Sequence, residues 1–176
     1  MPEMFRPGRR TFLQATAHAL ATFFGIGYAP SAPGTFGSIP GVVMGLILAR
    51  TATVRPVYGL ALWTGLLAIG LWSVIVFEAS EKVHDDSRVV IDEVMGQSLA
   101  FLPLVFLAPS VLYWEPLELT LLCLAAFTLF RIFDIWKPGP LGWIDRTWET
   151  PLGTCLDDLL AGLIAGIILI AGLFFL

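Results

Sequence analysis

The strongest constraint in this sequence is a set of long segments that contain no charged residue. Residues 57–77 and 94–114 are two such runs of 21 residues each, and each is long enough to cross a hydrocarbon layer about 30 Å thick as a helix. Residues 159–176 form a third run of 18 residues. Only 14% of the chain is charged and 57% is hydrophobic, whereas soluble domains are about 25% charged. The sequence therefore predicts a helical membrane protein.

The N-terminal part of the chain has a different pattern. Residues 11–49 contain no Asp, Glu, Lys or Arg but are interrupted by three prolines, so they do not form one continuous helix. Ahead of the prolines, Gln14, His18 and Thr22 recur at helical spacing, with apolar side chains on the other face. This spacing predicts an amphipathic helix that lies in the membrane interface. Beyond the prolines, we expect Ser38 to cap a short membrane span.

We expect a single integral-membrane domain over residues 1–176. Its predicted fold is all-α and polytopic, with an N-terminal interfacial helix followed by transmembrane helices. The uncharged run 119–130 reaches spanning length only when it is extended by its flanks near Glu118 and Arg131. The predicted crossings, about five in number, are residues 38–54, 57–77, 94–114, 116–136 and 157–176.

The charges gather on one side of this predicted bundle. With five crossings, the loops at 79–92 and 131–156 share a face with the segment 28–37, and the turns at 50–56 and 109–116 lie opposite. Eight of the ten Lys and Arg residues and twelve of the fourteen acids fall on the first face. Because basic loops are retained in the cytoplasm, we expect this face to be cytoplasmic.

Five carboxylates occur at predicted helix boundaries on the charged face. An acid at a helix N-terminus is commonly a cap, and capping explains four of the five as structural residues. Two adjacent pairs and a further acid would repel one another when packed together, unless a cation compensates. Oxygen ligands at a lipid boundary suit Mg²⁺, which retains water and joins a few carboxylates to a substrate phosphate. Both interpretations apply to Asp92, Glu93, Asp134, Asp157 and Asp158.

Basic residues accompany these acids. Arg131, Asp134 and Lys137 follow one another at i, i+3 and i+6, so they share one broad helix face. They form either an ion-pair ladder or a metal ligand flanked by two phosphate-binding cations. Arg146 is a further candidate contact for a phosphate or headgroup, with an interfacial ion pair as the alternative.

Two loops could also bind phosphate or move protons. The segment GYAPSAPGTFGS at 27–38 is not a nucleotide-binding loop, but Thr35 and Ser38 lie near a predicted helix N-terminus with donors suited to phosphate. The alternative is that segment 27–38 is only a turn between two helices, which requires the same residue types. His84, in the polar loop, is placed for proton transfer or is simply solvated.

Four motifs together resemble the bacterial phosphatidylglycerophosphatase A family. The resemblance runs from about residue 20 to the C-terminus in the same order and spacing, with Ser87 where the family is expected to have Gly. It implies a Mg²⁺-dependent phosphatase of the bacterial inner membrane, which converts phosphatidylglycerophosphate to phosphatidylglycerol in phospholipid biosynthesis. The motifs are GYAPSAPGTFGS at 27–38, HDDSRVVIDEVMG at 84–96, FRIFDIWKPGPLGWIDR at 130–146 and DDLLAG at 157–162.

The resemblance also implies where the active site lies. The five acids match family acids that would hold the metal, and Arg131, Lys137 and Arg146 match basic positions near the phosphate. We assign catalytic roles to Arg131, Asp134, Lys137 and Asp158, with the nucleophile being either water or a carboxylate. The expected metal ligands are Asp92, Glu93, Asp134, Asp157 and Asp158, and the expected substrate-binding residues are Thr35, Ser38, His84 and Arg146.

Two other functions are alternatives. A divalent-cation transporter also carries intramembrane acids, but these would be spread across membrane depth, and the runs 57–77 and 94–114 contain none. A lipid-headgroup transferase is the second alternative, although the D-G-x-x-A-R signature of CDP-alcohol phosphatidyltransferases is absent from the sequence. The net charge of −4 argues against nucleic acid as a partner. We expect a lipid substrate and the bilayer as partners, and the sequence leaves the oligomeric state open.

Overall fold

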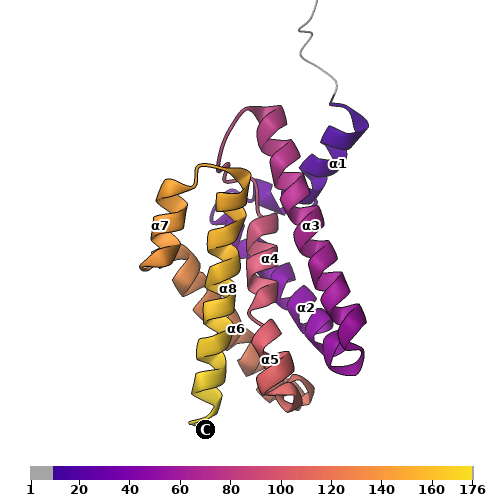
Figure 1. Cartoon of the computed structure of the whole chain (residues 1–176), viewed down its shortest axis with the longest axis vertical. Helices are drawn as coiled ribbons and strands as arrows, with labels where there is room; N and C mark the ends of the chain where they lie inside the picture. Colours follow the sequence, from indigo (N-terminus) through magenta and orange to yellow (C-terminus); the bar gives the residue numbers. More distant parts are fainter. Residues whose placement is uncertain (1–9, 176) are drawn as a thin grey trace, which may run out of the picture.

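Four long apolar helices form the body of the protein. A computed structural model describes residues 10–175, which contain helices and connecting loops and no β-strand (Figure 1). The predicted all-α, polytopic membrane fold is confirmed. The helices with the length and composition of membrane spans are α2 (Pro33–Val54), α3 (Pro56–Glu81), α6 (Pro116–Trp136) and α8 (Pro151–Leu173).

Shorter helices connect and complete this bundle. They are α1 (Phe12–Ala21), the 3₁₀ helix η1 (Ile26–Tyr28), α4 (Ile91–Leu99), α5 (Leu102–Leu107), the 3₁₀ helix η2 (Pro109–Tyr113) and α7 (Pro140–Thr147).

The prediction of one continuous helix over 94–114 is wrong. This segment is divided among α4, α5 and η2, because Pro103 and Pro109 each lack an N–H group and crowd the carbonyl four residues earlier. The chain tightens at the first break, where the Ala100 amide donates to the Gln97 carbonyl at 3.3 Å. The broken segment still carries the chain from one end of the molecule to the other (Figure 1). The fold therefore contains four unbroken crossings and one interrupted crossing.

The predicted cap at Ser38 is also wrong. Helix α2 begins five residues earlier at Pro33, and its N-cap is Ala32, in a left-handed conformation with φ of 46°. Proline is favourable at a first helical position because its missing N–H has no helical partner there. Ser38 lies one turn inside the helix, where its hydroxyl donates to the Gly34 carbonyl at 2.9 Å. Pro40 is accommodated within α2.

Helix α1 has the amphipathic character that the sequence predicts. Thr11 and Gln14 form a reciprocal capping box at its start. The polar face turns toward the protein, since His18 is buried and stacks on Phe77 of α3 with ring centroids 4.7 Å apart. Phe12, on the opposite face, is 85% exposed. This orientation matches a helix that lies at a membrane surface with its apolar side in lipid.

Glycines allow the interrupted crossing to pack at the centre of the bundle. Helix α4 lies between α2 and α8 and packs most extensively against these two helices (Figure 1). A Cβ atom on Gly162 of α8 would lie 1.9 Å from the Gly96 carbonyl oxygen of α4, and one on Gly41 of α2 would lie 2.7 Å from Gln97 Cβ. Only glycine permits such close helix contacts.

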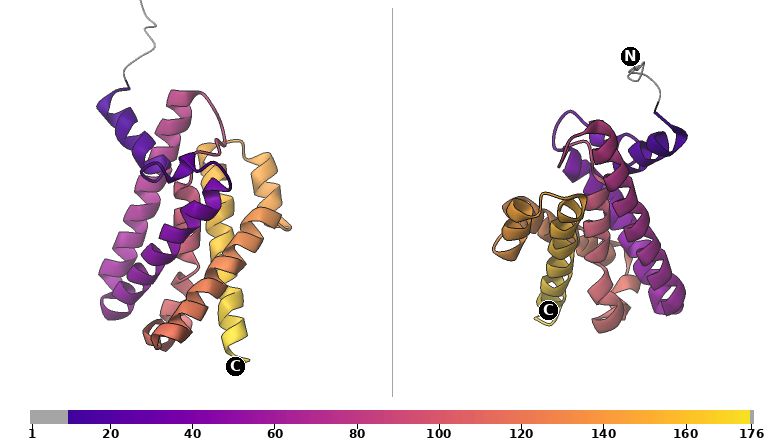
Figure 2. Two further views of the ribbon diagram at one scale, coloured as in Figure 1. Left: turned by 180° about the vertical axis from the view of Figure 1, so that it is seen from behind. Right: turned by 45° about the horizontal axis from the view of Figure 1, so that its top comes forward.

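The two ends of the bundle differ in polarity. The start of α2, the end of α6, the loop before α4 and the start of α8 converge at one end, as the view from behind shows (Figure 2). The turn between α2 and α3, the helix η2 and the C-terminus lie at the other end (Figure 1). The segments expected on the charged face therefore share one end. Of the charged residues expected on this face, Glu3, Arg6 and Arg9 lie outside the described residues.

Candidate active site

A polar cavity opens at the charged end of the bundle. Its volume is about 160 Å³, and it is bordered by five parts of the chain: the start of α2, the loop before α4, the start of α4, the segment from the end of α6 through α7, and the start of α8. Seven residues predicted for the site line it, with one further acid from α7 and two from the loop. The predicted residues are His84, Asp92, Glu93, Asp134, Lys137, Asp157 and Asp158.

Three of the acids are close enough to share one cation. Asp92, Glu93 and Asp158 each present an oxygen, and these oxygens all lie within 4.8 Å of one another. Asp92 and Glu93 occupy the first turn of α4. Asp158 lies in the second turn of α8, which begins at Pro151, so the prediction that this helix opens at Asp157 is wrong. Gly96 allows this approach, since a Cβ atom there would lie 2.4 Å from the Asp158 carbonyl oxygen.

Two carboxylate oxygens at the site have no partner among the described residues. Glu93 Oε2 and Asp157 Oδ1 are buried and make no hydrogen bond. A buried, unpaired carboxylate oxygen is unfavourable, because it has lost its hydration without replacement. Together with the all-oxygen donor set, this observation shows that the site is chemically suited to a hard cation such as Mg²⁺.

The charge balance of the cavity also favours a cation. Eight carboxylates line it, and Lys137 is the sole lysine or arginine among the described residues that do so. Such a cavity would repel a phosphate group unless a bound cation offset the negative charge.

The two predicted cations contact different acids. Arg131 forms the expected i,i+3 ion pair with Asp134, and its Nη1 atom lies 3.5 Å from Ser38 Oγ. Lys137 instead contacts Asp145 and lies 2.5 Å from Asp157 Oδ2. The reason is its left-handed backbone, with φ of 46°, at the end of α6. Arg131 and Lys137 therefore do not continue along one helix face as the spacing predicted.

Three predicted substrate-binding residues do not line the cavity. Ser38 is fully buried and lies beside Arg131. The Thr35 amide donates to the Ala32 carbonyl at 2.9 Å within the turn that starts α2, and Arg146 is exposed on α7. From the segment 27–38, Pro33 and Gly34 are the residues that line the cavity.

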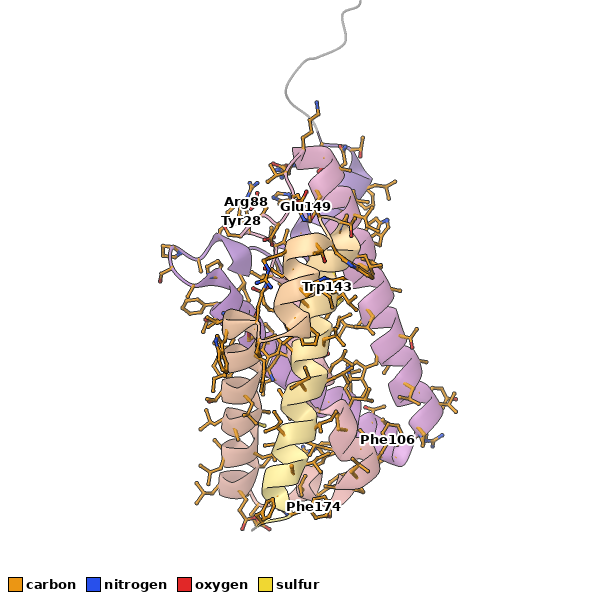
Figure 3. The ribbon with its side chains drawn as sticks, turned by 60° about the vertical axis from the view of Figure 1, so that its left-hand side comes forward. Tyr28, Arg88, Phe106, Trp143, Glu149 and Phe174 are labelled. Atoms are coloured by element: carbon orange, nitrogen blue, oxygen red, sulfur yellow. The ribbon has the colours of Figure 1, made fainter. Side chains whose placement is uncertain are left out.

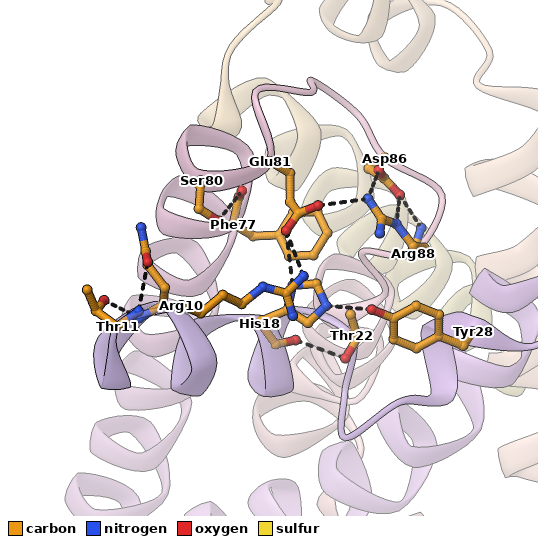
Figure 4. Close-up of polar contacts among 11 residues, drawn as sticks. Arg10, Thr11, His18, Thr22, Tyr28, Phe77, Ser80, Glu81, Asp86 and Arg88 are labelled. Atoms are coloured by element: carbon orange, nitrogen blue, oxygen red, sulfur yellow. Dashed lines mark hydrogen bonds and ion pairs between the residues drawn. The ribbon is translucent and has the colours of Figure 1, made fainter. Parts of the chain in front are cut away.

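The loop that carries His84 is anchored by charged groups. Arg88 donates to both carboxylate oxygens of Asp86, at 2.8 and 2.6 Å, and lies 3.5 Å from Glu81 at the end of α3 (Figure 4). The hydrogen bonds from Arg88 hold the pKa of Asp86 below its usual value. The Arg88 guanidinium also lies 5.4 Å from the centre of the Phe77 ring. These contacts fix the loop where it borders the cavity.

Glu78 is a site residue that sequence reasoning missed. It is buried near the end of α3, and its Oε2 atom lies 3.0 Å from His84 Nδ1. The two residues are six positions apart, on either side of the helix end, so no helical periodicity relates them. The remaining signal is weak: Glu78 is the first charged residue after the uncharged run 57–77.

The fold and the cavity together define an integral-membrane protein with an acid-lined site at one boundary of its apolar bundle. Comparison with known proteins identifies the family within this class. The family described as phosphatidylglycerophosphatase A matches residues 19–173. The chain belongs to the phosphatidylglycerophosphatase A family, and it is accordingly a phosphatase.

Three individual relatives are similar in sequence to this chain over most of its length. A phosphatidylglycerophosphatase A of Haemophilus influenzae is 34% identical over 94% of this chain and 93% of its own length. One from Escherichia coli is 33% identical over 88% of this chain and 83% of its own length. A Bacteroides thetaiotaomicron protein, provisionally named a phosphatidylinositol-3-phosphatase, is 32% identical over 85% of this chain and 89% of its own length. No solved structure matches the chain.

Proposed function

We propose that this protein is a Mg²⁺-dependent phosphatase that removes the terminal phosphate of phosphatidylglycerophosphate and leaves phosphatidylglycerol. The observation that carries this proposal is the group of Asp92, Glu93 and Asp158 oxygens within 4.8 Å of one another, in a cavity at the polar end of a membrane bundle. The relatives named phosphatidylglycerophosphatase A support the same substrate.

Asp92, Glu93 and Asp158 would hold the cation, with Asp134 and Asp157 beside them in the same cavity. When bound, Mg²⁺ supplies positive charge that polarises the phosphoryl oxygens and acidifies water. The donor set supports this choice, because Mg²⁺ prefers oxygen ligands and few protein carboxylates.

The surrounding side chains supply binding and proton transfer. Lys137 would offset negative charge that develops on the phosphoryl oxygens, and Arg131 would orient Asp134 through their ion pair. Asp157 Oδ1, which has no hydrogen-bond partner among the described residues, is suited to accept a proton from an attacking water. A carboxylate that attacks phosphorus directly is the alternative nucleophile.

The position of the cavity suits a lipid substrate. Exposed aromatic residues lie at its end of the bundle. Tyr28 and Trp143 are two of them (Figure 3), and Trp136 is the last residue of α6. Aromatic side chains are enriched at the headgroup level of membranes. The acyl chains can therefore stay in the bilayer while the phosphate enters the cavity. The described acids gather mainly at this end, which does not support the transporter alternative.

We place the cavity at the cytoplasmic face of the bacterial inner membrane. Six basic residues of the described chain lie at the cavity end of the bundle, and Arg50 and Arg55 lie near the opposite turn. This asymmetry favours a cytoplasmic location for the cavity end. The six are Arg10, Lys82, Arg88, Arg131, Lys137 and Arg146.

Phosphate release from purified protein in detergent with Mg²⁺ tests the substrate. We expect hydrolysis of phosphatidylglycerophosphate to be faster than that of phosphatidylinositol 3-phosphate. The inositol lipid is the competing substrate, because one relative is provisionally named a phosphatidylinositol-3-phosphatase. Phosphatidylglycerol, which has no monoester, is the matched blank. Faster release from the inositol lipid, or none from phosphatidylglycerophosphate, would contradict the proposal.

A further inference from the structure

Glu78 connects three parts of the protein beside the cavity. Its side chain is 8% exposed, and both carboxylate oxygens accept hydrogen bonds. Oε2 lies 3.0 Å from His84 Nδ1, while Oε1 accepts from the Asp85 amide at 3.3 Å and from the Thr154 hydroxyl at 3.2 Å. Glu78 thereby joins the end of α3 to the polar loop and to α8.

This contact determines which nitrogen of His84 is free. An ionised carboxylate only accepts hydrogen bonds, so His84 Nδ1 carries a proton toward Glu78 and Nε2 is left for another partner. His84 lines the same cavity as the acids. Its side chain is 38% exposed, whereas Asp92 and Asp158 are 6% and 5% exposed. His84 therefore lies nearer the mouth of the cavity than Asp92 and Asp158 do.

We infer that Glu78 is a positioning residue, which holds His84 so that its Nε2 atom donates a proton to the leaving oxygen of the lipid headgroup. The inference rests on the proposed function. Attacking and leaving oxygens lie on opposite sides of phosphorus in phosphoryl transfer. Attack from the side of the buried acids therefore directs the ester oxygen toward the mouth, where His84 lies.

The proton transfers balance in this scheme. The water oxygen bonds to phosphorus, and a cavity carboxylate takes one of its protons. The bond between phosphorus and the headgroup oxygen breaks, its electron pair stays on that oxygen, and the oxygen takes the proton from His84 Nε2. The products are the headgroup alcohol and inorganic phosphate, and His84 regains a proton from solvent. Glu78 Oε2 lies 3.0 Å from Nδ1, so its contact fixes the orientation of the ring while Nε2 donates.

Two substitutions separate this role from a purely structural one. In Glu78→Gln, the amide can keep the bond to Thr154 but loses the charge beside the imidazole. In His84→Asn, the side-chain amide can replace Nδ1 as the donor to Glu78, but nothing replaces Nε2. Thr154→Val is the matched control, because it removes one contact of Glu78 and leaves the pair with His84.

The experiment compares two phosphate monoesters that carry the same acyl chain in detergent micelles, one with an alkyl leaving group and one with a 4-nitrophenyl leaving group. A phenolate leaves without a proton, whereas an alkoxide requires one. Since general acid catalysis contributes about 100-fold or more, Glu78→Gln and His84→Asn should lower kcat for the alkyl ester by about 100-fold and for the aryl ester by less than about 3-fold. Any loss in Thr154→Val should be equal for both esters.

Equal losses for the two esters in His84→Asn and Glu78→Gln would overturn the inference and leave Glu78 as a link between helices. Thermal unfolding in detergent identifies variants that have lost the fold. If Glu78→Gln does not fold, His84→Asn decides the question. Absence of phosphate release by the wild-type protein from either ester and from phosphatidylglycerophosphate would instead overturn the proposed function, and the inference with it.

Discussion

Lys137 Nζ lies 2.5 Å from Asp157 Oδ2 and so joins the end of α6 to the start of α8. Burial acts against the charge on Lys137, but hydrogen bonds to Asp145 and Asp157 outweigh it and raise the pKa of the lysine. Lys137 therefore stays protonated throughout the neutral range. A permanent positive charge beside Asp157 suits a site that must bind an anionic phosphate.

Lys137→Ala should weaken hydrolysis of the phosphomonoester far more than binding of the product lipid. The substrate monoester carries close to two negative charges near neutral pH, whereas phosphatidylglycerol retains only the charge of its diester. We expect kcat/KM to fall about 100-fold, the magnitude typical for loss of one charge-stabilising group, with product affinity nearly unchanged. Kinetics and product inhibition in matched micelles measure both. Equal losses would make Lys137 a membrane-surface anchor.

Asp134→Asn and Asp158→Asn should each lower phosphate release by at least about 100-fold, because the amide keeps the side-chain shape but removes the charge that would hold the cation. Both proteins should fold. Relief of repulsion among the acids should leave the Tm of Asp158→Asn equal to or above that of the wild type, whereas Asp134→Asn also loses its ion pair with Arg131 and should have a lower Tm. Glu149→Gln is the control, since Glu149 is an exposed acid at the same end that does not line the cavity (Figure 3). Near-normal turnover in Asp134→Asn or Asp158→Asn would make that acid a structural residue.

Gly162→Ala should destabilise the bundle. The new Cβ atom would lie 1.9 Å from the Gly96 carbonyl oxygen, and overpacking of this kind costs about 1–3 kcal/mol. Gly172 lies on the same helix with nothing within 4 Å of its Cβ position, so Gly172→Ala is a matched control. Thermal unfolding in detergent should show a lower Tm for Gly162→Ala alone. A Gly162→Ala protein as stable as the control would show that α4 and α8 are not in the close contact described.

Ser87→Cys should react with an impermeant thiol reagent from the cytoplasmic side only. Ser87 borders the cavity, and we propose that the cavity faces the cytoplasm. Arg55→Cys, near the opposite turn, should react from the periplasmic side. Both variants are made in a protein whose two natural cysteines, Cys123 and Cys155, have been replaced by alanine. Labelling of Ser87→Cys from the periplasm in intact cells would reverse the topology and move the site to the other membrane face.

The sequence predicted the membrane bundle and the convergence of its acids for sound physical reasons. Runs such as 57–77 lack charge because a charged group in lipid is unfavourable. The number of crossings between two loops then determines whether they share an end. Hydropathy does not report helix continuity, so the breaks at Pro103 and Pro109 were missed in the run 94–114. That run is also unusual because α4 is almost entirely buried in protein.

The finer errors at the site arise where the backbone leaves helical geometry. Lys137 takes a left-handed conformation, so spacing along α6 did not predict its contact with Asp157. Glu78 and His84 meet across the end of α3, where Lys82 is also left-handed, with φ of 57°. Contacts of this kind depend on loop conformation and not on periodicity, and they became visible only in three dimensions.

We propose that Asp92, Glu93 and Asp158 hold a divalent cation and that hydrolysis depends on this cation. The most direct measurement is phosphate release from phosphatidylglycerophosphate by the purified protein, before and after chelation of divalent cations and again after Mg²⁺ is restored. We predict that chelation abolishes release and that Mg²⁺ restores it in the wild type, while Asp158→Asn stays inactive at every Mg²⁺ concentration. Undiminished release from the fully chelated wild-type protein would show that hydrolysis does not depend on a divalent cation at these acids.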